Sequence, residues 1–207
     1  MVDINNQLLR LNLEDAQEEI AKLIGLGYTD VILTFPILED GNYEIDDMIS
    51  KYNVFKLNFK GINLYLGNEI NYHYSLIHRL KSNDCLTLNQ TNYVLIKLPD
   101  ENPHQLRQLI NALPDYKIII SCVDQYKYFS YHDLVDLKKL GVLYLVNIKN
   151  VHKGKAKKLL KKKLIDFLVT YDDINFLDNK ILKKIDHNYH QNLKYYNYEE
   201  IINANIG

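Results

Sequence analysis

The sequence contains no tryptophan and only two cysteines among its 207 residues. The two cysteines, Cys85 and Cys122, are too few for a disulfide-stabilised scaffold and too far apart for a Cys-x-x-Cys pair. No stretch has the basic-then-apolar pattern of a secretion signal, and no apolar run approaches the roughly 18 residues of a membrane-spanning helix. We therefore expect a cytoplasmic protein in a reducing compartment, with no transmembrane segment.

The chain also lacks an excess of charge of either sign. Its 25 lysines and arginines nearly balance its 26 aspartates and glutamates, leaving a formal charge of −1. This balance argues against a dedicated nucleic-acid-binding protein. Hydrophobic residues make up 47% of the chain, as is typical of globular proteins, and a chain of this length can form one sizeable core. We expect one domain over residues 1–207.

Apolar runs typical of buried strands alternate seven times with segments of helical periodicity. Asn12 is predicted to cap the first helix and Pro36 to end the second strand. The remaining elements are expected as strands at residues 62–67, 93–98, 116–122, 142–148 and 165–171, a short extended segment at 85–88, and helices at 45–59, 72–81, 102–113, 130–141, 153–163 and 198–204. The pattern indicates a parallel sheet, either closed into a barrel or open and doubly wound.

Functional side chains in parallel α/β folds project from the C-terminal ends of the strands. The predicted strand ends carry Asn5, Gln7, Ile37, Leu38, Glu69, Lys97, Cys122, Asp124, Asp172 and Ile174. None of these residues is histidine, because all seven histidines fall in predicted helices or loops. The strand ends therefore lack the imidazoles that a hydrolytic centre of several divalent ions requires. No glycine-rich phosphate-binding motif follows any strand.

Segments of the chain resemble, in order, motifs of one enzyme family. Residues 1–7, Met-Val-Asp-Ile-Asn-Asn-Gln, are similar to a Met-Ile-Asp-Ile-His-Ser-His opening. Residues 34–43 are similar to an Ala-Thr-Pro-His-His stretch that ends in Gly-x-Tyr, and residues 67–69 keep a Gly-x-Glu. Residues 86–97 resemble Leu-Thr-Leu-Asn followed by Leu-Ile-Glu, residues 121–125 stand in place of Ala-His-x-Glu-Arg, and residues 170–175 resemble Ala-Ser-Asp-x-His-Asn. The chain thus resembles the bacterial manganese-dependent tyrosine phosphatases of capsule biosynthesis, in the polymerase-and-histidinol-phosphatase superfamily.

The resemblance implies which residues occupy the positions of the family's metal and phosphate ligands. The family's histidine positions fall on Asn5, Gln7, Ile37, Cys122 and Ile174, and one of its glutamate ligands falls on Lys97. The glutamate of the Ala-His-x-Glu-Arg motif falls on Asp124, and its phosphate-binding arginine falls on Gln125. Only Glu69 and Asp172 are kept as ligands, while Asp3 is kept beside the first motif. The expected fold is a distorted seven-stranded TIM-like α/β barrel of this superfamily, with its metal site dismantled.

We accordingly expect a pseudoenzyme that needs no cofactor. The resemblance implies a protein partner, such as a tyrosine kinase or another component of an exopolysaccharide or capsule system. The alternative is a weak metal-dependent phosphotyrosine or phosphoester hydrolase, with Mn²⁺ or Mg²⁺ at Glu69 and Asp172, joined by Asp3 and Asp124 in a water-rich version of the site. A third possibility is a structural role through oligomerisation.

Two residues at the strand ends suggest how the lost site is replaced. We hypothesise that the Lys97 ammonium fills the former metal volume and pairs with Glu69 and Asp172, since two buried carboxylates would otherwise repel each other. Cys122 invites comparison with cysteine phosphatases, but these need an arginine six residues later, where this chain has Tyr128. A buried structural thiol is the simpler interpretation.

The strongest local charge feature is the lysine-rich segment at residues 153–163. Its leucines are expected to pack on the barrel and its lysines to face solvent. The alternative is a docking patch for an acidic or phosphorylated partner, or for an anionic membrane surface, formed by Lys155, Lys157, Lys158, Lys161 and Lys162. The 17 tyrosines are expected mainly in packing, although a tyrosine-rich recognition surface is an alternative.

Overall fold

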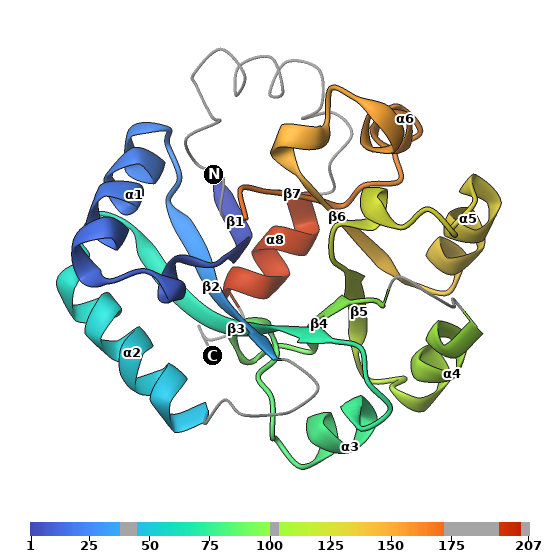
Figure 1. The fold of residues 1–207 in the computed structure, drawn as a ribbon, viewed down its shortest axis with the longest axis horizontal. Helices are drawn as coiled ribbons and strands as arrows, with labels where there is room; N and C mark the ends of the chain where they lie inside the picture. Colours follow the sequence, from blue (N-terminus) through green and yellow to red (C-terminus); the bar gives the residue numbers. More distant parts are fainter. Residues whose placement is uncertain (38–44, 100–103, 172–194, 204–207) are drawn as a thin grey trace.

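Seven parallel strands form a single ring in which each strand pairs with the next one along the chain (Figure 1). The computed structural model describes residues 1–37, 45–99, 104–171 and 195–203. The strands are β1 (Val2–Asn6), β2 (Asp30–Ile37), β3 (Asn63–Asn71), β4 (Tyr93–Lys97), β5 (Lys117–Ile120), β6 (Leu143–Asn147) and β7 (Phe167–Val169). A bridge between Asn6 and Tyr171 joins the first strand to the end of the last, so the sheet closes into a barrel.

Helices surround the barrel and connect its strands, as expected for right-handed crossovers between parallel neighbours. The connecting helices are α1 (Leu13–Gly25), α2 (Ile45–Asn58), α3 (Leu76–Lys81), α4 (His104–Ala112), α5 (Tyr131–Lys139) and α6 (Gly154–Lys161), while α8 (Tyr195–Ile202) follows the last strand. Short 3-10 turns are η1 (Leu8–Arg10), η2 (Leu88–Gln90), η3 (Val123–Gln125) and η4 (Ile148–Asn150). Within the described ranges, no helix combines the length and apolar character needed to cross a bilayer.

The alternation of side chains along each strand separates two cores. Residues that point inward, such as Ile32, Leu95, Ile119 and Phe167, fill the barrel. Their neighbours in sequence point outward and form a larger cluster under the surrounding helices. Both faces of every central strand are therefore buried, which explains why the strands are continuous apolar runs instead of alternating ones.

The C-terminal helix α8 closes one mouth of the barrel, and Figure 1 shows it in the middle of the ring of strands. Its Tyr198 hydroxyl accepts a hydrogen bond from the Leu168 amide at 3.0 Å. Its Glu200 forms an ion pair with Lys117 and accepts a hydrogen bond from the Tyr93 hydroxyl. Tyr93 and Lys117 are the first residues of β4 and β5, so α8 covers the N-terminal strand ends. The C-terminal ends face the opposite mouth.

The predicted cap of the first helix at Asn12 is confirmed, while residues 102–103, where another helix start was expected, lie outside the described residues. The Asn12 side chain accepts a hydrogen bond from the Asp15 amide at 2.9 Å and begins α1. Ser130 and Asp133 form a reciprocal capping box at the start of α5. The seven-stranded parallel barrel that the pattern and the resemblance indicated is also the observed fold.

Several predicted boundaries are wrong, including the start of α8, which begins at Tyr195 instead of residue 198. β2 continues past Pro36 to Ile37, because β1 pairs with β2 only as far as Leu33 and the missing proline N–H is tolerated where one neighbour has ended. β3 continues to Asn71, and the Tyr72 amide bonds the Lys97 carbonyl at 2.7 Å, so α3 begins only at Leu76. Residues 85–88 form no strand and lead into η2.

Gly67 is predicted to be essential for packing η2 against β3. A Cβ at this position would lie 2.7 Å from Leu88 Cδ2 and 3.1 Å from the Leu88 Cα, closer than packed atoms approach. Gly67→Ala should therefore lower the free energy of unfolding by about 1–3 kcal/mol, measured by urea denaturation. Gly25→Ala is the matched control, because nothing lies within 4 Å of a Cβ there. Equal stabilities of the two variants would contradict this account.

Candidate functional site

The Glu69 carboxylate is the centre of a polar cluster at the C-terminal strand ends. The side chain is 1% exposed and lies inside the barrel mouth. It accepts hydrogen bonds from Asn5 Nδ2 at 3.0 Å, from Gln7 Nε2 at 3.2 Å, from the Tyr171 hydroxyl at 2.9 Å and from the Ser121 hydroxyl. Each carboxylate oxygen thus accepts two hydrogen bonds, and all four donors are neutral groups. We call these five residues the Glu69 shell.

Neutral hydrogen-bond donors can stabilise a buried carboxylate by replacing the water molecules that would otherwise solvate it. Removing an ionised carboxylate from water costs several kcal/mol unless other groups replace its hydration. Hydrogen bonds to a charged group contribute about 1.5–3 kcal/mol each, so a complete set of donors offsets a large part of that cost. Burial and the nearby Glu69 charge raise the pKa of Tyr171, which keeps its phenol protonated as a donor.

An irregularity in β1 delivers both amides to the same carboxylate. Asp3 pairs with Val31 and Asn6 with Leu33, so the register with β2 shifts by one residue between them. The Thr34 hydroxyl donates to Asn5 Oδ1, which fixes the amide so that its nitrogen faces Glu69. The sequence prediction that Asn5 and Gln7 leave the strand on one side agrees with this arrangement, but the bulge contributes to it.

Asp3 belongs to a second, separate set of hydrogen bonds that joins β1 to the end of β7. Its carboxylate accepts from the Asn5 amide at 3.1 Å, from Asn6 Nδ2 at 3.4 Å, from the Thr170 amide at 3.2 Å and from the Thr170 hydroxyl. Complete burial raises the pKa of Asp3 from 3.8 to about 6 despite these donors. Asp3 thus ties the closing strands of the barrel together next to the Glu69 shell.

Cys122 lies two residues after the end of β5, in the left-handed conformation with φ of 49°. Burial, followed by the charge of Glu69, raises the pKa of its thiol to about 12. The thiol therefore stays protonated near neutral pH, which argues against a nucleophilic cysteine. Asp124 in η3 is half-buried and accepts a hydrogen bond from Asn150 Nδ2 at 2.9 Å, and the neighbouring Gln125 is exposed.

The hypothesis that Lys97 replaces the metals at Glu69 is wrong. Lys97 is exposed, and within the described part of the chain it forms no ion pair with Glu69. The oxygens that its ammonium was expected to bind are already taken by the four neutral donors. The other half of the hypothesis concerns Asp172, which lies outside the described residues together with Ile174 and Leu38.

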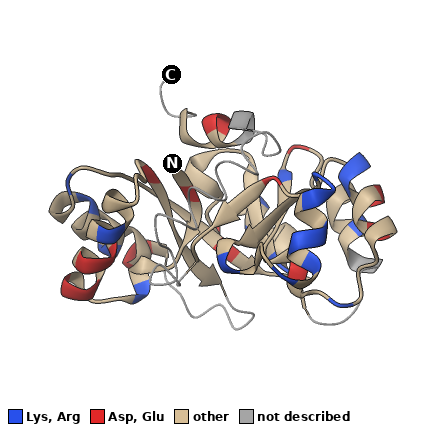
Figure 2. Ribbon diagram, turned by 90° about the horizontal axis from the view of Figure 1, so that it is seen from above, with Lys and Arg blue, Asp and Glu red and all other residues tan. Residues whose placement is uncertain are grey.

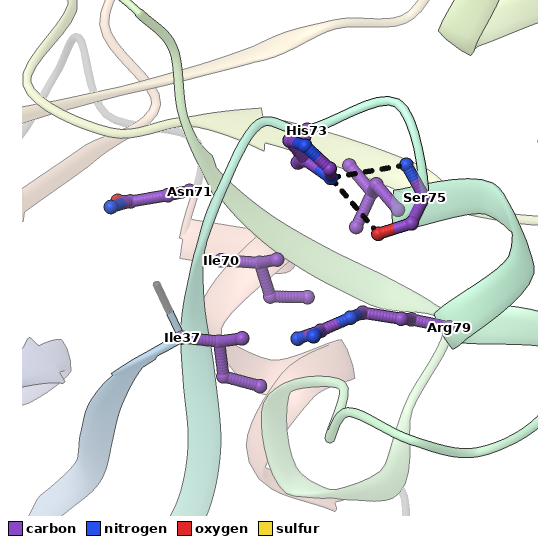
Figure 3. Close-up of a pocket in the computed structure, with 7 residues that line it drawn as sticks. Ile37, Ile70, Asn71, His73, Ser75 and Arg79 are labelled. Carbon is purple, nitrogen blue, oxygen red and sulfur yellow. Dashed lines mark hydrogen bonds between the residues drawn. The ribbon is translucent and has the colours of Figure 1, made fainter. Parts of the chain in front are cut away.

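Ile37 lies apart from the Glu69 shell. Ile37 is buried at the end of β2. Together with Ile70 it lines the apolar side of a small cavity that His73 and Arg79 also line (Figure 3). The His73 ring is turned toward Ser75, to whose hydroxyl its Nδ1 lies at 3.1 Å. The ligand position that the resemblance assigns to Ile37 is therefore filled by aliphatic packing.

Sequence reasoning missed two members of the Glu69 shell, Ser121 and Tyr171. Ser121 had a detectable signal, because it lies two residues after Ile119, which points into the barrel. Tyr171 has φ of 63°, an unusual conformation for a tyrosine that no local pattern predicts.

The described donors do not fit a centre of several metal ions. Among residues 1–37, 45–99, 104–171 and 195–203, no group of three or more His, Cys, Asp and Glu side chains is placed to hold one. The amide nitrogens of Asn5 and Gln7 face Glu69 as hydrogen-bond donors, and a nitrogen that donates to a carboxylate cannot also coordinate a cation.

Comparison with solved structures identifies the fold. The chain superimposes on a chain from the crystal structures of YwqE from Bacillus subtilis and CpsB from Streptococcus pneumoniae, described as metal-dependent tyrosine phosphatases, with a TM-score of 0.78 and 18% identity over 89% of this chain and 87% of that one. An inactive dihydroorotase-like domain of a Chaetomium thermophilum CAD-like multifunctional protein also matches, with a TM-score of 0.56 and 13% identity over 97% of this chain and 77% of the domain. The fold is thus the α/β barrel of the tyrosine phosphatases.

Comparison of sequences identifies the family. Residues 39–203 match the model of the family described as capsular polysaccharide synthesis, CpsB/CapC, and the chain belongs to this family. A Staphylococcus aureus protein assigned as a tyrosine-protein phosphatase, CapC, is 30% identical over 126 residues, which are 55% of this chain and 49% of the relative. The chain therefore spans about half the length of that relative. The family that the motifs indicated is confirmed.

The buried Asp3 carboxyl predicts a specific pH dependence of stability. Because its pKa is higher in the folded state (about 6) than its ordinary value of 3.8, the folded protein binds more protons between these values and loses stability as pH rises through them. Asp3→Asn lacks this loss. The difference in unfolding free energy, wild type minus variant, should therefore fall by about 3 kcal/mol from below pH 4 to pH 7, measured by urea titrations. A constant difference would contradict the raised pKa.

Ser121→Ala and Lys97→Ala form a matched pair that tests the Glu69 shell. Ser121→Ala removes one donor from a buried carboxylate and should cost about 1–3 kcal/mol of stability. Lys97→Ala changes an exposed side chain and should stay within about 0.5 kcal/mol of wild type. Chemical denaturation at neutral pH measures both. A larger loss for Lys97→Ala than for Ser121→Ala would restore the lysine hypothesis.

Proposed function

We propose that this protein is a catalytically degenerate member of the capsule-synthesis tyrosine phosphatase family that acts as a binding or regulatory protein. The observation that carries the proposal is the Glu69 shell, in which amides and hydroxyls donate hydrogen bonds to the carboxylate that the resemblance assigns to metal binding. We propose that residues 1–207 act as one domain in the cytoplasm.

The chemistry of phosphoester hydrolysis supports this proposal. Metal ions lower the pKa of a bound water, orient it and neutralise the charge that develops on the phosphoryl group. The donors around Glu69 are neutral and already paired with the carboxylate. Cys122 does not serve as a nucleophile in place of a metal-bound water, because its thiol stays protonated near neutral pH. The Glu69 shell and Cys122 therefore lack the free lone pairs and the thiolate that would activate a water or attack phosphorus.

The proposed partner is a tyrosine kinase or another component of a capsule or exopolysaccharide system. The support for it is membership of a family described by capsular polysaccharide synthesis. A partner of this kind would bind the barrel as a folded scaffold, so the binding surface need not coincide with the Glu69 shell.

One observation favours the alternative, a weak metal-dependent phosphoester hydrolase. Gln7 Oε1 is buried and has no hydrogen-bond partner among the described residues, although Gln7 Nε2 bonds Glu69. An unpaired acceptor beside a carboxylate suits a cation as well as a water molecule. In this alternative, Glu69 and Asp172 hold one Mn²⁺ or Mg²⁺.

Metal analysis combined with a hydrolysis assay distinguishes the two functions. We expect the purified protein, dialysed against Mn²⁺ and then against metal-free buffer, to retain no stoichiometric metal. Its hydrolysis of a phosphotyrosine peptide in Mn²⁺ should equal that of Glu69→Gln, because neither protein binds the ion. The Streptococcus pneumoniae relative serves as the positive control for the assay.

Stoichiometric metal in the wild type, accompanied by hydrolysis that Glu69→Gln abolishes, would overturn the proposal in favour of the enzyme. Co-purification of the full chain with proteins of the source cell tests the binding role separately. Recovery of a tyrosine kinase with both the wild type and Glu69→Gln would support a scaffold whose binding does not depend on catalysis.

A further inference from the structure

The helix α6 and the residues next to it form the strongest local concentration of positive charge in the sequence. Residues 153–163 contain seven lysines and no acidic residue, in a chain whose net charge is only −1. Figure 2 shows blue and red segments on both sides of the molecule, with blue segments most prominent on the side that carries α6. The lysines of residues 153–163 are therefore gathered on one helix and its ends.

Packing fixes the orientation of α6. Ala156, Leu159 and Leu160 are buried against the barrel, so the lysines between them are directed outward. Lys155 differs from the other four lysines of the predicted docking patch, because it is half-buried and donates to the Tyr126 carbonyl at 2.7 Å and to the Phe129 carbonyl at 2.9 Å. Lys155 thus anchors the helix instead of extending into solvent.

The lysines are unfavourable for the helix that carries them. Lys153 occupies the N-cap position without a capping hydrogen bond, and Lys155 lies in the first turn, where the helix dipole disfavours cations. The exposed pairs Lys157–Lys161 and Lys158–Lys162 place like charges four residues apart, which repel. A helix that served only to cover the barrel would be more stable with mixed charges, so this composition points to binding.

A groove of about 410 Å³ lies between α6 and the start of α5. It is lined by Tyr131, Lys155, Lys158, Leu159, Lys161 and Lys162. The Lys162 ammonium lies 5.7 Å from the centroid of the Tyr131 ring, and Tyr131 is 49% exposed. The lining therefore combines four cations with one aromatic and one aliphatic side chain.

The acidic residues of α5 are already engaged within that helix. Asp133 accepts a hydrogen bond from the Ser130 amide at 2.8 Å, and Asp136 pairs with Lys139 at 2.8 Å and with His132 at 3.1 Å. No carboxylate lines the groove among the residues that the structure describes. Lys158, Lys161 and Lys162, in contrast to the anchored Lys155, are exposed and directed toward solvent, where an anion of another molecule can reach them.

We propose that this groove binds an acidic segment of a protein partner. The concave shape accepts an extended peptide, whereas a membrane surface is flat and would contact only the outermost lysines. Carboxylate or phosphate groups of the segment would pair with Lys158, Lys161 and Lys162, and the Tyr131 ring with Leu159 would contact an apolar residue between them. This binding does not depend on the state of Glu69.

Fluorescence anisotropy tests the groove with a labelled peptide of glutamates around one central tyrosine. Wild type should bind it with an affinity that falls as ionic strength rises. Lys158→Glu/Lys162→Glu should weaken binding by about tenfold. The control Lys60→Glu/Lys81→Glu makes the same change in net charge at exposed lysines outside the groove and should bind nearly as well as wild type. Circular dichroism and urea denaturation verify that both variants fold.

Equal loss of affinity in the two double variants would overturn the proposal, because it would show attraction by net charge alone. Absence of peptide binding by the folded wild type would also overturn it. Vesicles of phosphatidylserine and phosphatidylcholine form a further arm: binding to vesicles but not to the peptide would assign the lysines to a membrane surface instead. Glu69→Gln, verified to fold by circular dichroism, should bind the peptide as wild type does, because Glu69 does not line the groove. Binding at the groove can then be established even if the metal and hydrolysis experiments contradict the proposed function.

Discussion

The burial of the Glu69 carboxylate among neutral hydrogen-bond donors is the constraint on which the mouth of this barrel depends. A buried charge must be surrounded by donors, and the donors here come from the end of β1, from the residue after β5 and from the segment after β7. Because these segments are far apart in sequence, the shell forms only when the barrel closes. The same carboxylate that the resemblance assigns to catalysis thus joins the first, third, fifth and last strands.

The resemblance assigns histidine positions to Asn5 and Gln7, and the amides at these positions have a different chemistry. A neutral imidazole that binds a metal presents a lone pair, whereas an amide nitrogen presents hydrogens, which the Glu69 carboxylate accepts here. The Thr34 hydroxyl donates a hydrogen bond to Asn5 Oδ1, and this bond fixes the amide so that its nitrogen faces Glu69. Hydrogen bonds from neutral groups thus hold this buried carboxylate within the barrel.

Much of this architecture could be predicted from the sequence, because its signals are local. Continuous apolar runs indicate buried parallel strands, and side-chain caps such as Asn12 and Ser130 mark where helices begin. Contacts between residues that are far apart in the sequence were harder to predict from it. Lys97 has the right charge to replace a metal, but only the completed barrel shows that neutral donors occupy Glu69 first. Pro36 is a reliable strand breaker only when both neighbouring strands continue beside it, and the end of β1 cannot be read locally.

The Glu69 shell and the basic groove are connected by one segment of the chain. Ser121 donates to Glu69, and five residues later the Tyr126 carbonyl accepts from Lys155, which anchors α6. The Tyr126 hydroxyl in turn accepts from the Leu98 amide at 2.9 Å, just after β4. The segment that completes the carboxylate shell therefore also fixes the lysine helix. The hydrogen bonds of the barrel mouth and the contacts that hold α6 in place therefore share the residues between Ser121 and Tyr126.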